Sequence, residues 1–186
     1  LDDILNDPEL DAVAIETTEA NLTKYARLAL GKGLPVHMDK PGSADHAAFT
    51  EMVRLAEKKN LVFHVGYMYR YNPAVVQLME DIHAGRLGEI YSVEAQMNCL
   101  HTVEKRNWLG NYPGGMLYFL GCHLIDLIYA IQGEPEEILP MSMPSGLDGV
   151  TADDFGMVVF RYRSGISFAK STAVEYGGFE RRQLVV

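Results

Sequence analysis

The sequence has few cysteines and no long hydrophobic run. Only Cys99 and Cys122 occur among 186 residues, and they are not in a CxxC arrangement. A disulfide framework is therefore not expected, and a reducing, cytoplasmic compartment fits the composition better. No apolar run approaches the roughly 20 residues of a membrane-spanning helix. The 6 histidines show no HxxxH or HExxH spacing, so we predict no metal site.

Positive charge is also scarce. Asp and Glu number 25 against 16 Lys and Arg, which gives a net charge of −9 with no basic segment. Because an acidic surface repels phosphate groups, we expect no nucleic-acid or membrane partner. The 48% hydrophobic and 22% charged content is ordinary for a soluble globular protein. The chain begins at Leu1 and ends on an apolar run, so we expect both ends to be cut from a longer protein.

Short apolar runs alternate with amphipathic stretches in the first third of the sequence. Runs rich in Val and Ile that are too short for helices indicate buried strands, and apolar residues three and four positions apart indicate helices. This βαβαβ order predicts a parallel sheet covered by helices. The predicted strands are Asp11–Thr17, Val36–Met38 and Leu61–Tyr67, and the predicted helices are Leu1–Asp7 (the end of one), Ala20–Leu30 and Ser43–Lys59.

The pattern changes near residue 70. Pro73 is favoured at the first position of a helix, and Gly85 would end that helix. From Glu136 onward strand follows strand, with a hairpin turn at Arg163–Gly165. We therefore predict a parallel α/β domain at 1–70 and an α+β domain with a mostly antiparallel open sheet at 71–186. The further predicted elements are helices at Pro73–Ala84 and Gly115–Ile131 and strands at Glu89–Cys99, Phe155–Tyr162 and Ile166–Val174.

The predicted helix Gly115–Ile131 carries the most chemical information. Phe119, His123 and Asp126 share one face of it, at intervals of four and three residues. A histidine and an aspartate within two turns can form an acid–base or orienting pair. The alternative is a partly buried histidine next to a solvent-facing aspartate. A different face is an apolar stripe of Leu117, Leu120, Gly121, Leu124, Leu127, Ile128 and Ile131.

Two further segments carry polar residues just after predicted strands. Lys40 follows Val36–Met38, and open α/β sheets bind ligands at the carboxyl ends of their strands. Lys40 can donate a hydrogen bond to a substrate hydroxyl or to a ribose, or it is an ordinary surface lysine in a turn. Arg70 follows the next strand and either braces a cofactor pocket or forms a structural ion pair.

A basic–aromatic cluster and a glycine turn precede the helix that contains His123. Lys105, Arg106 and Trp108 can contact a sugar, since an aromatic face stacks on the C–H surface of a pyranose. The alternative for Trp108 is a place in the core. The glycines of Pro113–Gly115 permit a close backbone approach of the kind found beside ligands, although they are equally common in turns.

Five segments, in this order along the chain, resemble the glucose–fructose oxidoreductase / inositol 2-dehydrogenase (Gfo/Idh/MocA) family. The resemblance implies a partial Rossmann-type domain that uses NAD or NADP, followed by an α/β domain whose open sheet forms a homo-oligomer interface. The five segments are DAVAIET at Asp11–Thr17, HMDKP at His37–Pro41, VGYMYRYNP at Val65–Pro73, GRLGEI at Gly85–Ile90 and GGMLYFLGCHLID at Gly114–Asp126.

The resemblance also implies roles for individual residues. Lys40 would contact both the cofactor and the substrate hydroxyl, and His123 would take the hydroxyl proton. We expect Asp126 to orient His123, and Trp108 and Phe119 to contact the substrate. Phe119 stands where many members carry an aspartate, and this departure motivates the alternatives below. The further candidates for cofactor binding are Thr17, Asp39, Pro41 and Arg70.

We therefore predict an NAD(P)-dependent oxidoreductase that transfers a hydride between nicotinamide and a hydroxyl of a sugar, sugar acid or cyclic polyol. One alternative is sugar elimination or glycoside cleavage assisted by NAD, without net redox. Another is a redox-inactive sugar-binding or assembly module. The sequence contains no G-x-G-x-x-G phosphate-binding loop, so residues 1–186 on their own are expected to be inactive.

Overall fold

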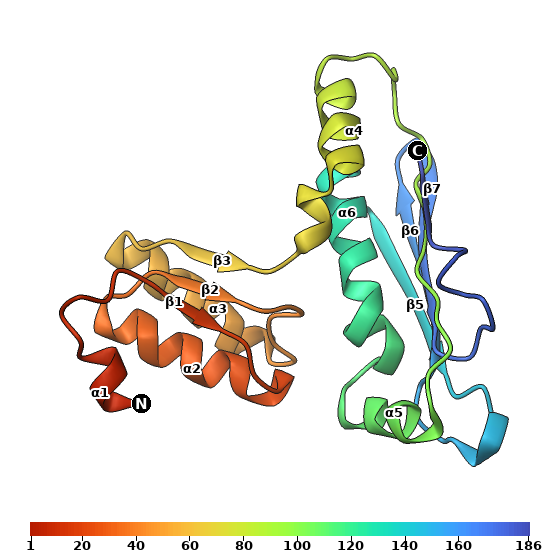
Figure 1. Cartoon of the computed structure of the whole chain (residues 1–186). Helices are drawn as coiled ribbons and strands as arrows, with labels where there is room; N and C mark the ends of the chain where they lie inside the picture. The colour runs from red at the N-terminus through yellow and green to blue at the C-terminus, as the bar shows by residue number, and fades with distance from the viewer. The chain divides into compact units, whose positions relative to one another are not determined.

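The computed structural model describes residues 1–186 and contains two compact units, Leu1–Tyr67 and Met68–Val186 (Figure 1). Each unit has its own sheet and its own hydrophobic core. The boundary lies close to the position at which the sequence pattern changes. None of the helices is both long enough and apolar enough to cross a membrane.

The first unit is a three-stranded parallel sheet with the strand order β1-β2-β3, so the parallel sheet predicted from the βαβαβ pattern is confirmed. Helices connect the strands, as parallel pairs require. The second of these helices begins at His46 rather than at Ser43, because Asp45 is its N-cap and accepts a hydrogen bond from the Ala48 amide at 3.0 Å. The elements are α1 (Asp2–Leu5), β1 (Val13–Ile15), α2 (Glu19–Lys32), β2 (Val36–Met38), α3 (His46–Lys59) and β3 (Phe63–Val65).

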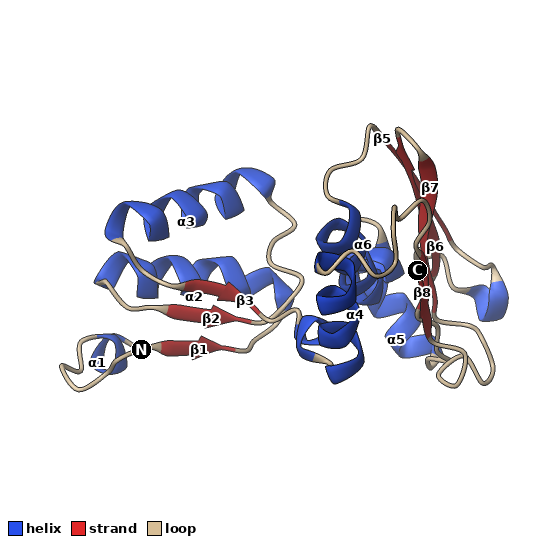
Figure 2. Cartoon of the chain, turned by 90° about the horizontal axis from the view of Figure 1, so that it is seen from above, coloured by secondary structure: helices blue, strands red, loops and turns tan.

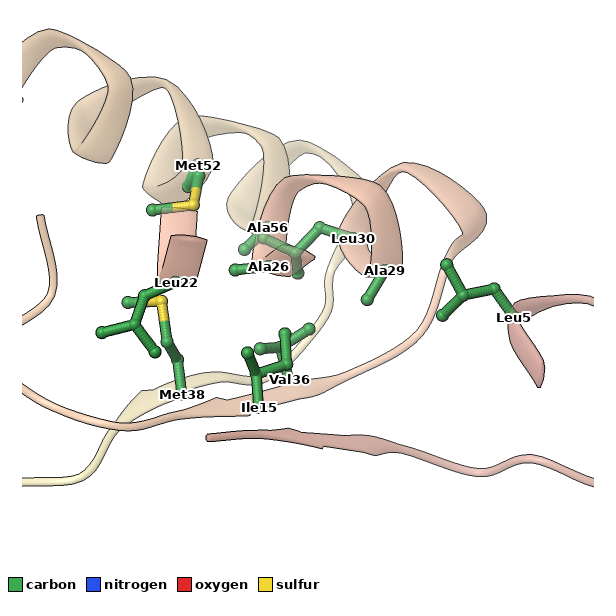
Figure 3. Close-up of a cluster of buried hydrophobic side chains, with 10 residues drawn as sticks. All are labelled: Leu5, Ile15, Leu22, Ala26, Ala29, Leu30, Val36, Met38, Met52 and Ala56. Atoms are coloured by element: carbon green, nitrogen blue, oxygen red, sulfur yellow. The ribbon is translucent and has the colours of Figure 1, made fainter. Parts of the chain in front are cut away.

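The core of the first unit lies between the two long helices and one face of the sheet (Figure 3). Val36 and Met38 of β2 are buried there, while His37 between them points to the other face and is exposed. Leu22 of α2 and Met52 of α3 are fully buried in the same core. This packing holds the three-stranded sheet in place, and the candidate residues Thr17 and Lys40 follow the ends of its strands.

The second unit contains a five-stranded sheet with the order β5-β6-β7-β4-β8. Neighbouring strands are antiparallel except for β4 and β7, so the prediction of a mostly antiparallel sheet is confirmed. The hairpin between β6 and β7 turns at Arg163 and Ser164, as predicted. The strands are β4 (Glu94–Gln96), β5 (Glu137–Met143), β6 (Phe155–Tyr162), β7 (Gly165–Thr172) and β8 (Gln183–Val185).

The strand predicted at Glu89–Cys99 is much shorter in the structure, where β4 spans only Glu94–Gln96. The segment before it crosses the end of the β6–β7 hairpin, and a Cβ atom at Gly165 would lie 1.7 Å from the carbonyl oxygen of Tyr91. The residues before β4 therefore cross the hairpin instead of pairing along it. Backbone pairing with β7 starts at Val93, whose carbonyl accepts a hydrogen bond from the Phe168 amide at 3.0 Å.

Helices α4 and α6 lie on the same side of this sheet (Figure 2). Leu124 and Ile128 of α6 belong to one core with Val158, Phe160 and Ala169 of the sheet. The helical elements are η1 (Met68–Tyr71), α4 (Pro73–His83), α5 (Val103–Trp108), η2 (Leu109–Asn111), η3 (Leu117–Gly121), α6 (Cys122–Gln132) and η4 (Leu147–Gly149), of which η3 is a π-helix.

The opposite face of the five-stranded sheet carries half-exposed apolar side chains. In the register of the sheet, Leu139 of β5 is paired with Val159 of β6, and Met141 with Met157. Because side chains alternate between faces, these residues point away from the face on which Val158 packs with α6. Leu139 and Met141 are 48% and 54% exposed.

Candidate active site

The carboxyl ends of the parallel strands meet at one edge of the first unit's sheet. Ile15, Met38 and Val65 are in register, and each is the last residue of its strand. Thr17 therefore lies just beyond β1 and residues 39–41 just beyond β2, where open α/β sheets bind ligands. Thr17, Asp39, Lys40 and Pro41 are all partly buried at this edge.

Hydrogen bonds hold this edge in place. The Asp39 amide donates to the Ile15 carbonyl at 3.0 Å, and the Tyr67 hydroxyl donates to the Pro41 carbonyl at 3.2 Å. Gly66 follows β3 directly beside Asp39, since a Cβ atom on this glycine would lie 3.5 Å from the carboxylate oxygen. The backbone on both sides of Lys40 is therefore anchored to the neighbouring strands.

The donor and acceptor groups at this edge fit part of a nicotinamide dinucleotide. Thr17 offers a hydroxyl, Asp39 a carboxylate and Lys40 an ammonium group. A carboxylate accepts hydrogen bonds from ribose hydroxyls, and an ammonium group donates to ribose or carbonyl oxygens. These residues would hold the ribose and nicotinamide end of the cofactor. The pyrophosphate would need the amide donors of a glycine-rich loop, a motif that residues 1–186 do not contain.

In the second unit, a glycine turn fixes the start of the helical segment that carries His123. Gly115 has a φ of +46°, and a Cβ atom at this position would lie 2.0 Å from the carbonyl oxygen of Asp153. The same oxygen accepts a hydrogen bond from the Met116 amide at 2.9 Å. Both the backbone conformation and the close approach therefore require glycine at position 115.

The segment predicted as a helix, Gly115–Ile131, is helical throughout, but residues Leu117–Gly121 form the π-helix η3. Tight packing against the sheet accompanies the π-helix. A Cβ atom at Gly156 of β6 would lie 2.5 Å from Leu117, and one at Gly121 would lie 3.6 Å from Ser171 of β7. Such π-helical turns are rare and frequently occur at functional sites.

His123 is buried near the start of α6, with 5% of its surface exposed. The Tyr69 ring meets the imidazole edge-on, with the ring centroids 4.9 Å apart and the planes at 72°. The Tyr69 hydroxyl in turn accepts a hydrogen bond from Arg182 at 3.4 Å. The sequence-based candidates do not include Tyr69, which is far from His123 in the chain, and only its place in the VGYMYRYNP segment points to it.

Asp126 forms a two-point ion pair with Arg70. The Nε and Nη2 atoms of Arg70 donate to the two carboxylate oxygens, each at 2.7 Å. The Asp126 side chain is only 10% exposed, so the alternative of a solvent-facing aspartate is wrong. This ion pair is the structural alternative that the sequence analysis gave for Arg70. A cofactor contact of Arg70 and an orienting role of Asp126 stay predictions.

Four partly exposed side chains gather beside η3, and we call them the Lys105 cluster: His101, Lys105, Trp108 and Phe119. The Lys105 ammonium lies 3.3 Å from the centroid of the Trp108 ring and 4.3 Å from that of the Phe119 ring. The two rings meet edge-to-face with centroids 5.3 Å apart, and the His101 ring lies 6.3 Å from Phe119. The structure thus brings the predicted substrate residues Trp108 and Phe119 together.

The electrostatic environment of this cluster is positive. Burial lowers the pKa of His101 below its usual value, and the charges of Lys105 and Arg182 lower it further. The imidazole is therefore mostly neutral near pH 7 and acts as a hydrogen-bonding group rather than as a third cation.

Arg106 anchors α5, the helix that carries Lys105 and Trp108. Its guanidinium is 2% exposed and donates to Asp154 at 2.9 Å and to Asp148 at 2.7 Å. Arg106 is thus too deeply buried to contact a sugar, and its inclusion among the sugar-contacting residues is corrected to a structural role. Its partners lie far along the chain, so no local pattern distinguishes it from a surface arginine.

Comparisons with known proteins place these two units in one family. Residues 75–186 match a family model described as the GFO/IDH/MocA C-terminal domain, and residues 1–67 match one described as oxidoreductase family, NAD-binding Rossmann fold. The uncharacterized oxidoreductase YhhX of Escherichia coli is 30% identical over 74% of this chain and 40% of its own length. The scyllo-inositol 2-dehydrogenase (NADP(+)) IolW of Bacillus subtilis is 24% identical over 96% of this chain and 48% of its own length.

A solved structure shares the fold. The WlbA dehydrogenase from Bordetella pertussis, in complex with NADH and UDP-GlcNAcA, has a TM-score of 0.83 at 22% identity, over 96% of this chain and 53% of that chain. The chain spans about half the length of the relatives that it matches. Since the two family models together match nearly all of its residues, the chain belongs to the Gfo/Idh/MocA family of NAD-binding oxidoreductases.

Proposed function

We propose that the protein containing this chain is an NAD(P)-dependent oxidoreductase of sugars, sugar acids or cyclic polyols. The observation that carries the proposal is the buried His123, held against Tyr69 at the start of α6. An imidazole in a fixed position suits proton exchange with a single substrate hydroxyl. Membership of an oxidoreductase family, and a relative named as a scyllo-inositol dehydrogenase, support a substrate that carries hydroxyl groups.

In the proposed reaction, His123 takes the proton of the reacting hydroxyl during oxidation and returns it during reduction. The Lys40 ammonium would donate a hydrogen bond to a substrate oxygen and stabilise negative charge that develops on it. Nicotinamide, when bound, supplies or accepts the hydride. Thr17, Asp39 and Pro41 at the strand ends would position it for this transfer.

Asp126 would be a positioning residue in this proposal. Its ion pair with Arg70 ties α6 to η1, the short helix that also carries Tyr69. Because Tyr69 contacts His123, the ion pair and the aromatic contact together would fix the imidazole relative to the substrate.

The aromatic rings of the Lys105 cluster support a ring-shaped substrate. Phe119 lies one helical turn before His123, and Trp108 packs edge-to-face on Phe119. Aromatic faces pack on the apolar C–H faces of pyranose and cyclohexane rings, and both side chains keep part of their surface exposed. A sugar or cyclic polyol that lies on these rings would bring its hydroxyl groups close to His123.

Steady-state assays of the full-length protein test this proposal. We expect nicotinamide fluorescence to appear when oxidised NAD or NADP is mixed with a substrate from a panel of inositols, aldoses and uronic acids. Saturable NADH binding without turnover of any of these compounds would contradict the proposal. A product at the oxidation state of the substrate, with no free NADH, would identify NAD-assisted elimination. Failure to bind NADH at all would favour the sugar-binding or assembly module.

We also propose that the exposed face of the five-stranded sheet forms a homo-oligomer interface. Leu139, Met141 and Met143 lie along one face of β5 and are each about half exposed. Contiguous exposed apolar patches on soluble proteins mark interaction sites. A second copy of the same face would cover these side chains through isologous contacts.

A further inference from the structure

We infer that the Lys105 cluster binds the carboxylate of an acidic sugar, so that sugar acids are preferred over neutral sugars and polyols. The inference rests on the proposed function, because it names the substrate class that the same site would take. It assigns Lys105 as the residue that determines this preference, and Trp108 and Phe119 as the surface on which the sugar ring lies.

The geometry of the cluster supports recognition of both parts of such a ligand. The Lys105 ammonium lies against the Trp108 and Phe119 rings at 3.3 and 4.3 Å from their centroids. A charge-assisted hydrogen bond to a carboxylate is stronger than a cation–π contact at a partly exposed site. The ammonium can therefore turn from the rings to a ligand carboxylate, which leaves the ring faces available for the C–H surface of the sugar.

The position of Lys105 is defined by the fold. Thr102 is the N-cap of α5, and its hydroxyl accepts a hydrogen bond from the Lys105 amide at 3.3 Å. The next residue, Arg106, is held in the interior by Asp154 and Asp148. The backbone that presents Lys105 is thus fixed on both sides, and a pre-organised cation loses less entropy when it binds a ligand.

The surrounding charges also favour an anionic ligand, although the chain as a whole is acidic. Two carboxylates of the second unit are paired with other cations, Glu175 with Arg181 at 2.6 Å and Asp154 with Arg106 at 2.9 Å. The lowered pKa of His101 agrees with a positive local potential. Position 119, one turn before His123, carries a neutral ring, so no carboxylate there would repel an acidic substrate.

We would titrate two matched pairs, D-glucuronate against D-glucose and D-galacturonate against D-galactose, into the full-length protein saturated with NADH. Isothermal titration calorimetry measures the Kd of each ligand. The variants are Lys105→Met, Lys105→Arg and the control Lys24→Met, which removes an exposed lysine that lies 5.2 Å from the Tyr25 ring in the first unit.

We expect at least one acid to bind about tenfold or more tightly than its neutral partner, which is the contribution of one good charged contact. Lys105→Met should abolish that difference by weakening binding of the acid far more than binding of the neutral sugar, Lys105→Arg should retain most of it, and Lys24→Met should have no effect. An unchanged thermal unfolding midpoint shows that each variant is folded.

Acids that bind no more tightly than neutral sugars, or that do not bind at all, would overturn the inference. Equal loss of both ligands in Lys105→Met would do the same, because it would show that the lysine only supports the local structure. These outcomes are separable from failure of the proposed function. If the protein turns over neutral polyols and shows no preference for acids, only this inference is refuted. If it binds acids through Lys105 but turns over no substrate, only the proposed oxidoreductase activity is refuted.

Discussion

The Arg70 guanidinium donates two hydrogen bonds of 2.7 Å to the Asp126 carboxylate, yet the two partners differ in exposure. The Arg70 side chain is 50% exposed, whereas that of Asp126 is 10% exposed. A carboxylate that loses its partner away from water is penalised by the full cost of its desolvation. An arginine that loses its partner is solvated by water. The ion pair should therefore respond differently to the removal of each residue.

We expect Arg70→Ala to lower the free energy of unfolding by about 1–3 kcal/mol. Asp126→Ala should lower it by roughly 1 kcal/mol or less, as is typical of exposed pairs. Urea denaturation measures both variants. Arg161→Ala is the matched control in the same unit, since its two ion pairs with Glu136 and Glu137 are exposed on both sides. Equal losses for Arg70→Ala and Asp126→Ala would refute the asymmetry.

The glycine turn before His123 predicts that position 115 does not tolerate any residue with a Cβ atom. Gly115→Ala places a Cβ atom 2.0 Å from the Asp153 carbonyl oxygen in a backbone with φ of +46°. The left-handed conformation alone costs roughly 1–2 kcal/mol for an L-residue, and the clash adds to it. Gly146→Ala is the control, because Gly146 has a φ of +73° with open space around it. The midpoint of thermal unfolding should fall clearly further for Gly115→Ala than for Gly146→Ala. Similar falls for the two variants would mean that the close approach of the Asp153 carbonyl does not contribute to the destabilisation.

The lowered pKa of His101 predicts a specific pH dependence of stability. The unfolded chain takes up a proton on His101 near the ordinary pKa of 6.5, whereas the folded chain does so only at lower pH. This contribution to stability is therefore complete above pH 6.5 and is lost as the pH falls through the folded-state value. His101→Gln should flatten the fall in urea midpoint between pH 7 and pH 5. An identical fall in the unmodified protein and in His101→Gln would exclude this role for His101.

Local patterns were sufficient to predict several elements. The strand Val36–Met38 and the strand Phe155–Tyr162 have the predicted bounds, because apolar runs bordered by Pro35 and by the turn at Arg163 define them locally. The apolar stripe on the helix likewise identified Leu124 as a core residue. These features depend only on residues a few positions apart, which is the range over which side-chain periodicity operates.

The details of the candidate site depend on contacts between distant residues. Arg106 bonds to Asp154, 48 positions away, and Tyr69 reaches His123 from another element. The π-helix η3 is accompanied by close packing of Leu117 against a glycine of β6, for which the helical segment itself carries no signal. Composition and periodicity contain no information about such tertiary contacts.

The proposed oligomer interface predicts a change in assembly when its centre is charged. Met141→Glu places a carboxylate among the apolar side chains of β5, so we expect the oligomer to dissociate without loss of the fold. Val62→Glu is the control, because Val62 is 68% exposed and belongs to the first unit rather than to the five-stranded sheet. Sedimentation equilibrium measures the mass of each variant. A Met141→Glu protein with the mass of the unmodified one would contradict the interface.

The most direct measurement is the turnover of His123→Asn in the full-length protein, with the substrate and cofactor that the screen identifies. Asparagine is smaller but keeps a polar amide in place of the imidazole, and it does not exchange a proton near neutral pH. We predict that kcat falls by at least about 100-fold, while the Kd for NADH stays unchanged and cooperative thermal unfolding shows that the variant is folded. A kcat within a few-fold of the unmodified protein would show that His123 is not the acid–base residue and would contradict the proposed mechanism.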